Sequence, residues 1–184
     1  MGLVLKDQGK LEEAMKVYNT ATSIKPDYVT AHYNLGNALR SVIFKKPNKD
    51  LQRIIISILD KQKYVSPKHI ANAAISLLKF EPNLRKHLSL VYSDYDRQTL
   101  LDIINELSEL PLLLKLMSVC PLPDLGLENL FRKLRASLLL SISDITRSPE
   151  LLNFQSALAL QCFTNEYIYS HTAEEEKILQ SLEA

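Results

Sequence analysis

The feature that most constrains this chain is a repeat at its N-terminal end. The stretches GLVL and GNAL begin at Gly2 and Gly36, 34 residues apart. Self-similarity at a period of about 20–50 residues is typical of repeat proteins, in which each small unit buries its apolar side against its neighbours. Long alternating β-branched runs, which would predict strands, are absent from the sequence. The repeat therefore predicts stacked helical pairs and an all-α fold.

Further residues of the repeat stand at fixed positions. Leu35 and Gly36 form a small pair that permits close packing of the first helix, Gly9 falls in the turn, and Pro26 ends the second helix. Three side chains share one face of that second helix, namely Ala14, Tyr18 and Ala21. With these landmarks in register, residues 1–44 resemble a tetratricopeptide repeat. The resemblance implies helical hairpins that bind proteins or peptides and are not catalytic.

The repeat segment is too short to be stable alone. It spans one and a half repeats with its first helix cut short, whereas about three repeats are normally needed to bury the apolar faces. We therefore expect the rest of the chain to cover its C-terminal side. Because the N-terminal side lacks such a cover, we expect the chain to be a fragment of a longer protein. The last predicted helix reaches Ala184 without a stop signal, which also suggests a cut.

Residues 48–184 are predicted to form a helical bundle or irregular solenoid. Apolar residues recur there at the helical period, and prolines and N-cap residues separate the segments. Thr172 and Glu175 form a capping-box pattern, and Ser66 precedes Pro67 at another predicted helix start. The predicted helices cover residues 50–64, 66–80, 81–92, 96–110, 111–120, 127–143, 148–170 and 172–184.

A second resemblance covers residues 119–184. The motifs CPLPDL, LRASLL, FQSALALQCFTNEYIY and EEE carry it. This region resembles the helical middle part of bacterial proteins that combine N-terminal tetratricopeptide repeats with a C-terminal class I S-adenosylmethionine-dependent methyltransferase domain. The chain ends before that domain, so no cofactor-binding residue is carried over and no cofactor is predicted. The resemblance implies the partner-binding or regulatory part of such a protein.

Composition argues against several classes of function. The net charge is +1, from 22 basic and 21 acidic residues, which gives no general attraction to nucleic acid or to an anionic membrane. The four glycines form no phosphate-binding loop, the apolar runs are too short to cross a bilayer, and no His or Cys pair has metal-ligand spacing. We predict a cytoplasmic protein that is not an enzyme by itself, with Cys120 and Cys162 as free thiols.

The candidate peptide-binding residues are Asn34, Asn37 and Arg40, spaced three apart on the first helix of the second repeat. Asparagine amides can pair with both N–H and C=O groups of a peptide, and arginine can bind a carboxylate with two hydrogen bonds. Lys6 occupies the same face one repeat earlier. The alternative is that these are solvated polar positions. His32 takes the place of a large packing residue, so it is predicted to lie in the core.

The segment FTNEYIYSH supplies the candidate interface residues Phe163, Tyr167 and Tyr169. Glu166 and His171 lie close enough in sequence to suggest proton transfer, but the aromatic residues recur at helical spacing, which is more typical of packing. Tyrosines with a polar tip are favoured at contacts. An interface role is therefore preferred over catalysis.

Together these patterns predict a non-catalytic protein–protein interaction module, the N-terminal part of a modular methyltransferase-like protein. Two alternatives stay open. The chain could be a regulatory or substrate-contacting part of a methyltransferase, or a self-association module that forms a homodimer. For the protein–protein interaction module, the expected partner is a protein or peptide.

Overall fold

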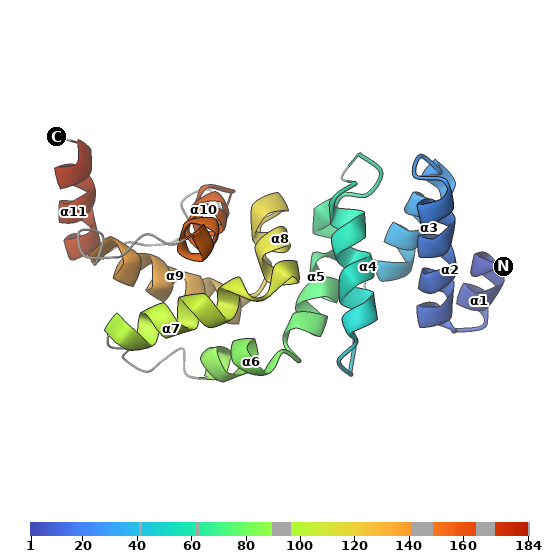
Figure 1. The fold of residues 1–184 in the computed structure, drawn as a ribbon, viewed down its shortest axis with the longest axis horizontal. Helices are drawn as coiled ribbons and strands as arrows, with labels where there is room; N and C mark the ends of the chain where they lie inside the picture. Colours follow the sequence, from blue (N-terminus) through green and yellow to red (C-terminus); the bar gives the residue numbers. More distant parts are fainter. Residues whose placement is uncertain (41, 62, 90–96, 141–148, 165–171, 184) are drawn as a thin grey trace. The chain divides into compact units, whose positions relative to one another are not determined.

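The computed structural model describes residues 1–40, 42–61, 63–89, 97–140, 149–164 and 172–183, and these residues form helices and their connections without a strand (Figure 1). The fold is all-α, as the sequence predicts. The helices are α1 (Gly2–Asp7), α2 (Leu11–Ile24), α3 (Val29–Leu39), α4 (Lys49–Leu59), α5 (Pro67–Leu78), α6 (Pro82–Ser89), α7 (Arg97–Ser108), α8 (Pro111–Val119), α9 (Leu125–Leu140), α10 (Pro149–Thr164) and α11 (Ala173–Glu183).

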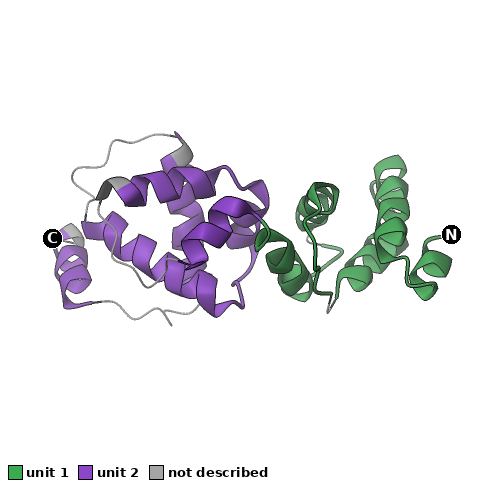
Figure 2. Cartoon of the chain, turned by 90° about the horizontal axis from the view of Figure 1, so that it is seen from below, with its two compact units in different colours: residues 1–80 green, residues 81–184 purple. Residues whose placement is uncertain are grey.

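The chain forms two compact units, residues 1–80 (unit 1) and 81–184 (unit 2), shown in different colours in Figure 2. The predicted repeat segment lies inside unit 1 together with α4 and α5. The boundary predicted between residues 44 and 48 separates segments by their sequence pattern, and it stays a prediction.

Unit 1 is a stack of helical pairs. Gly9 lies in the turn between α1 and α2. Its φ of 74° is a left-handed conformation that glycine adopts without steric cost. Helix α2 then packs against α1, α3 and α4, while α5 packs against α3 and α4. The stack therefore continues through α5, beyond the point where the repeat pattern ends in the sequence.

Two glycines allow close approach inside the stack. A Cβ atom on Gly2 would lie 2.5 Å from the Tyr18 ring, and one on Gly36 would lie 2.6 Å from Cγ1 of Val65. Real Cβ atoms do not come this near to a carbon atom, so both positions need a residue without a side chain. The predicted role of Gly36 in close packing is thereby explained, with Val65 as its neighbour.

Two residues of the connection between α3 and α4, Phe44 and Asn48, hold it against neighbouring helices. Near its centre, Phe44 is buried and its backbone N–H donates to the Ser76 hydroxyl of α5 at 2.9 Å. Asn48 ends the connection by accepting a hydrogen bond from the Leu51 N–H, which caps α4, and by donating to Glu12 of α2 at 3.2 Å. These contacts attach α4 to α2.

Unit 2 is built around α9 and α10. Helix α10 packs against α7 and α8, and α9 packs against α6, α7 and α11. Gln161 of α10 is fully buried, and its side chain accepts from the Leu122 N–H at 2.7 Å and donates to the carbonyl groups of Met117 and Cys120. A single amide thus satisfies the backbone where α8 ends before the proline-rich link to α9.

Each of the eight stretches predicted to be helical contains a helix. The capping box at the start of α11 is confirmed, since Glu175 N–H donates to the Thr172 hydroxyl and Thr172 N–H donates to the Glu175 carboxylate. Pro67 begins α5 as expected, although the Ser66 side chain makes no capping hydrogen bond.

Candidate functional site

The candidate site lies in unit 1, on the exposed side of α3. Buried residues occupy the opposite side of this helix, including Ala31, Leu35 and Ala38. Tyr33, Asn37 and Arg40 follow at a spacing of four and three residues, so they share the outward face. Tyr33 is 60% exposed, Arg40 is exposed and Asn37 is half-buried. Asn34 is also half-buried and lies at the edge of this face.

Helix α5 extends this face. It is buried on most sides because it packs between α3 and α4, and its exposed residues are Lys68, His69 and Asn72. Arg40 reaches across from the end of α3, with its Nη2 atom 3.3 Å from Nε2 of His69. We use the name α3–α5 surface for a set of exposed or half-buried residues on α3, at its C-cap and on α5, namely Tyr33, Asn37, Arg40, Lys68, His69 and Asn72.

Sequence reasoning missed the contribution of α5. The sequence Ile70–Ala73 (IANA) of α5 resembles Leu35–Ala38 (LGNA) of α3, with Ala71 in the position of the glycine, and the two helices pack against each other. Asn72 therefore corresponds to Asn37. The pattern was hard to detect because alanine replaces the glycine and the spacing is 35 residues rather than 34.

The remaining predicted site residues are placed elsewhere. Lys6 is exposed near the end of α1, a helix that packs against α2. Phe163 lies in α10 and is 66% exposed, whereas Tyr167 and Tyr169 fall outside the described residues. The structure therefore places Asn34, Asn37 and Arg40 along α3 and its C-cap, Lys6 on α1 of the same unit and Phe163 on α10 of unit 2.

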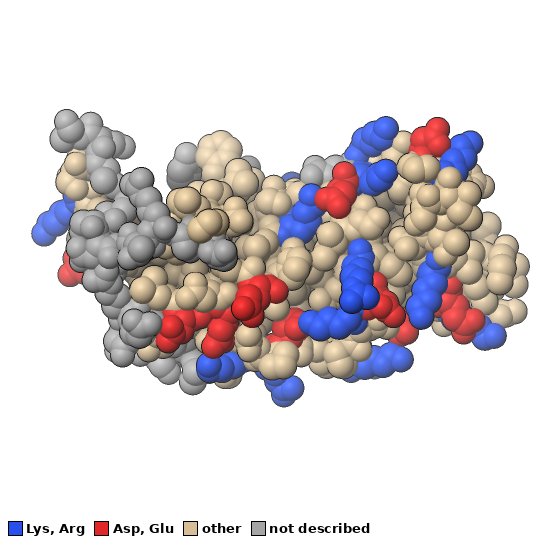
Figure 3. All heavy atoms as spheres, in the orientation of Figure 1, with Lys and Arg blue, Asp and Glu red and all other residues tan. Residues whose placement is uncertain are grey.

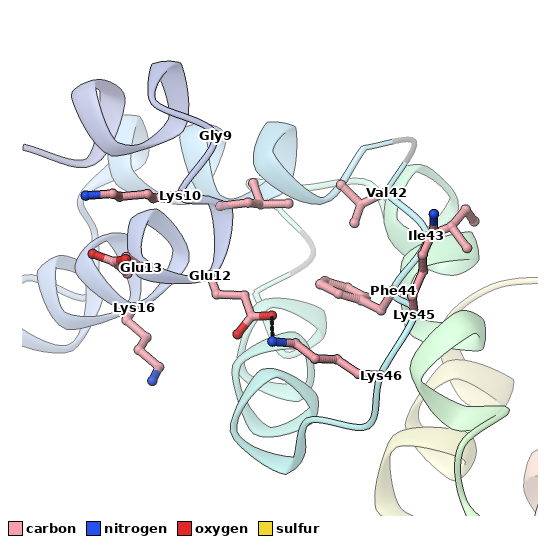
Figure 4. Close-up of a pocket in the computed structure, with 11 residues that line it drawn as sticks. Gly9, Lys10, Glu12, Glu13, Lys16, Val42, Ile43, Phe44, Lys45 and Lys46 are labelled. Atoms are coloured by element: carbon pink, nitrogen blue, oxygen red, sulfur yellow. Dashed lines mark ion pairs between the residues drawn. The ribbon is translucent and has the colours of Figure 1, made fainter.

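A depression of about 660 Å³ lies in unit 1 between the start of α2 and residues 42–46 (Figure 4). Within it, Glu12 and Lys46 point toward each other and form an ion pair at 3.4 Å, while Lys10 and Lys16 point away from this pair. Its lining mixes opposite charges with the side chains of Leu11, Val42 and Phe44. No group of polar atoms converges there in the way a small-molecule site requires.

Two histidines serve packing in the part of the chain that the structure describes. His32 is buried, stacks on Tyr64 with the ring centroids 4.5 Å apart, and lies with Nε2 2.9 Å from the Pro26 carbonyl. His87 of α6 is buried with Nε2 2.7 Å from the Glu106 carboxylate of α7. His32 thus lies in the core, as predicted.

The described residues offer no centre for metal binding, since no three His, Cys, Asp or Glu side chains group together among them. Cys120 and Cys162 form no disulfide, and burial raises the pKa of the Cys162 thiol. None of the described helices has the length and apolar content needed to span a bilayer.

Comparison with known proteins supports the reading of the N-terminal segment. Residues 2–40 match the family model of the TPR repeat. This repeat generally binds proteins or peptides and is generally not catalytic. No curated protein and no solved structure matches the chain. The match covers α1, α2 and α3, so it includes one of the two helices that form the α3–α5 surface.

Proposed function

We propose that unit 1 is a protein-interaction module that binds an extended peptide across the α3–α5 surface. The observation that carries this proposal is that α3 and α5 pack against each other and that each carries an asparagine at its surface, the half-buried Asn37 and the exposed Asn72. Each amide can donate to a peptide C=O and accept from a peptide N–H. Two such amides at repeat-related positions suit an extended backbone, and Asn34 adds a third. Lys6 would extend the site by one repeat.

The residue types of the α3–α5 surface are consistent with peptide binding. Over the face drawn in Figure 3, basic and acidic side chains of the chain are interspersed, which is the ordinary arrangement of a solvated surface. The α3–α5 surface differs because it combines an exposed tyrosine with asparagine and arginine. Tyrosine and arginine are enriched at protein interfaces, whereas lysine and carboxylates are depleted there.

The proposal is tested by panning a phage-displayed dodecapeptide library on the full chain and titrating the synthetic form of the strongest peptide by calorimetry. We expect Asn37→Ala and Asn72→Ala each to weaken binding about fivefold to tenfold, the cost of losing one or two net hydrogen bonds. Asn153→Ala, an exposed asparagine of α10, is the matched control and should leave the affinity unchanged. Equal affinity for all three variants would contradict the proposal.

The wider context is a separate proposal. We infer that the module belongs to the N-terminal part of a modular methyltransferase-like protein, as a non-catalytic or regulatory portion, and the resemblance of residues 119–184 is its support. The test is the reading frame downstream of the chain. A class I methyltransferase domain encoded there would support the proposal, and a stop codon directly after Ala184 would refute it.

A second candidate function, self-association, draws on α10. Leu152, Leu160 and Phe163 are 47%, 44% and 66% exposed on that helix. Exposed apolar side chains on one helix favour a protein contact. If the chain forms a homodimer through them, Phe163→Ser should lower the mass measured by light scattering to that of a monomer.

A further inference from the structure

The outward side of α10 carries apolar residues in an order that is symmetric along the helix. We propose that this side pairs with the same side of α10 in a second copy of the chain, with the two helices antiparallel and the two-fold axis of the dimer at Ser156. This inference rests on the self-association proposed above, and it adds the arrangement of the two copies.

Helix α10 is apolar on both of its sides. Its inward side packs against α7 and α8 and is buried at Leu151, Phe154, Ala157, Leu158 and Gln161. On its outward side, exposed residues recur at intervals of three or four positions, at Pro149, Leu152, Ser156, Leu160 and Phe163. A helix that is apolar all round is typically covered all round. The outward side of α10 therefore suits a partner.

The outward side of α10 is also uncharged. From Leu151 to Thr164 the helix contains no Asp, Glu, Lys or Arg, although a helix with one side in water usually carries charged residues there. Helix α9 shows the contrast. Its two exposed leucines, Leu125 and Leu140, lie at its opposite ends with charged residues between them. Two copies of the α10 side can therefore meet without repulsion between like charges.

The order of the outward residues favours a second copy over an unrelated partner. Leu152 lies four residues before Ser156 and Leu160 four residues after it, while Pro149 and Phe163 lie seven residues before and after. In a two-fold interface, residue i of one copy contacts residue j of the other, and j contacts i. An antiparallel pair centred on Ser156 therefore places Leu152 against Leu160 of the second copy at both ends of the contact.

Ser156 suits the centre of such a pair. It is smaller than the leucines on either side, so the two helices can approach closely where they cross and the leucines can interdigitate. Its hydroxyl donates to the Leu152 carbonyl of its own helix at 2.8 Å. Burial between two helices therefore leaves this donor satisfied. The antiparallel direction also places the positive end of one helix dipole beside the negative end of the other.

The length of α10 sets the expected strength of the contact. The helix has 16 residues and is therefore about 24 Å long. A contact made mainly by one pair of helices belongs to the small class of protein interfaces, which bind weakly. We therefore expect a dimer whose dissociation constant is about 1–100 μM, so that the association depends on protein concentration.

The first experiment measures association of the full chain by light scattering and sedimentation over a range of concentrations around this value. The mass should rise from the 20.9 kDa of one chain towards twice that mass. Ser156→Glu places two carboxylates at the two-fold axis, so it should raise the dissociation constant at least tenfold.

Ser181→Glu is the matched control for this variant. Ser181 is an exposed serine of α11, a helix that packs on α9, and its hydroxyl likewise donates to a carbonyl of its own helix, that of Ile178 at 2.7 Å. This variant should dimerise as the unaltered chain does. Circular dichroism of each variant checks that the fold is retained.

The second experiment tests the antiparallel arrangement by disulfide cross-linking, with oxidised glutathione as the oxidant that takes up the two thiol hydrogens. Ser156→Cys should cross-link with itself. Leu152→Cys and Leu160→Cys should cross-link when mixed but not when each is alone, because the two copies of either position lie about 12 Å apart along the helices, beyond the reach of a disulfide. The unaltered chain controls for Cys120 and Cys162.

Three results would overturn the inference, and they separate it from self-association itself. Cross-linking of Leu152→Cys with itself would show a parallel pair and leave the dimer intact. A dimer that survives Ser156→Glu but is lost in Phe163→Ser would place the two-fold axis elsewhere. A chain that stays monomeric at all concentrations would refute both the inference and the self-association on which it rests.

Discussion

At the scale of single residues, Gly36 shows how closely the stack is packed. The position lies inside α3, where glycine costs about 1 kcal/mol of helix stability relative to alanine. The two methyl groups of Val65 lie 2.6 and 2.8 Å from the place that a Cβ atom would take. Val65 is itself buried, so it has little room to move. The helix therefore tolerates a poor helix former because a better one would not fit.

Gly36→Ala should consequently lower the free energy of unfolding by about 1–2 kcal/mol, because overpacking costs about 1–3 kcal/mol and exceeds the gain in helix propensity. Urea unfolding followed by circular dichroism measures this change. The control is the double variant Gly36→Ala/Val65→Ala, in which the neighbour has been shortened. If the two changes simply add, with no favourable coupling of about 1 kcal/mol, the clash is not the cause.

A second single residue, Glu106, makes the stability of the folded protein depend on pH. The hydrogen bond from His87 is the largest influence that holds the pKa of the Glu106 carboxyl below its usual range, and the charges of His87 and Lys86 act in the same direction against the effect of burial. A carboxyl whose pKa is lowered by folding stabilises the folded state above its unfolded pKa of about 4.3. That stabilisation is lost as the pH falls through the lowered pKa.

Glu106→Gln should therefore destabilise the protein near neutral pH, and its deficit should shrink as the pH falls below about 4.3, where the wild-type carboxyl becomes protonated. Urea midpoints measured between about pH 3 and pH 7 test this expectation. Glu109→Gln, at an exposed position just after α7, is the control for the general effect of removing one carboxylate. A deficit that stays constant over the range would mean that the charge of Glu106 does not contribute.

At the scale of helices, the sequence predicts where helices form, but it does not predict which helices pack against each other. The start of α11 was predictable because a capping box is a local pattern of two residues. The packing of α5 beside α3 was not, because the two helices are far apart in sequence and an alanine stands in place of the usual glycine. The hydrogen bond between Arg40 and His69 could not be predicted either, since it joins residues that only that packing brings together.

The structure adds a second function to the α11 capping box. Glu175 is buried, and besides closing the box with Thr172 it pairs with Arg135 of α9, with Nη2 and Oε1 2.9 Å apart. Thr172→Ala should therefore weaken the helix start by about 1 kcal/mol while the ion pair keeps α11 on α9. Hydrogen exchange should rise in the first turn of α11 and stay unchanged in α9. Equal increases in both helices would show that the cap also holds the packing.

At the scale of the whole molecule, the all-α class and the positions of the helices along the chain followed from periodicity and punctuation, because these signals are local. The division into two compact units did not, since it depends on which helices share a core. Unit 1 is organised around residues such as Leu35 and Ile55, and unit 2 around residues such as Phe131 and Phe154, all fully buried. Each core is formed by side chains from several helices of its own unit.

Because the two units have separate cores, a substitution in one core should destabilise mainly its own unit. Gln161→Met leaves the Leu122 N–H and two carbonyl groups without their partner, so it should destabilise unit 2 by about 2–3 kcal/mol. Gly36→Ala acts in unit 1. Hydrogen exchange measured by mass spectrometry should show each variant raising exchange mainly in its own unit. If either substitution raises exchange equally throughout the chain, the two units unfold as one.

Helices α3 and α5, which form the α3–α5 surface, contain no Asp or Glu, and this affects how the protein should behave during purification. A net charge of +1 suggests weak retention on any ion-exchange resin near neutral pH. Adsorption depends on the part of the surface that faces the resin, however, and not on the sum over the chain. The protein should therefore bind a sulfonate cation exchanger through Arg40 and Lys68 at low ionic strength, and elute as soon as modest salt screens this one region.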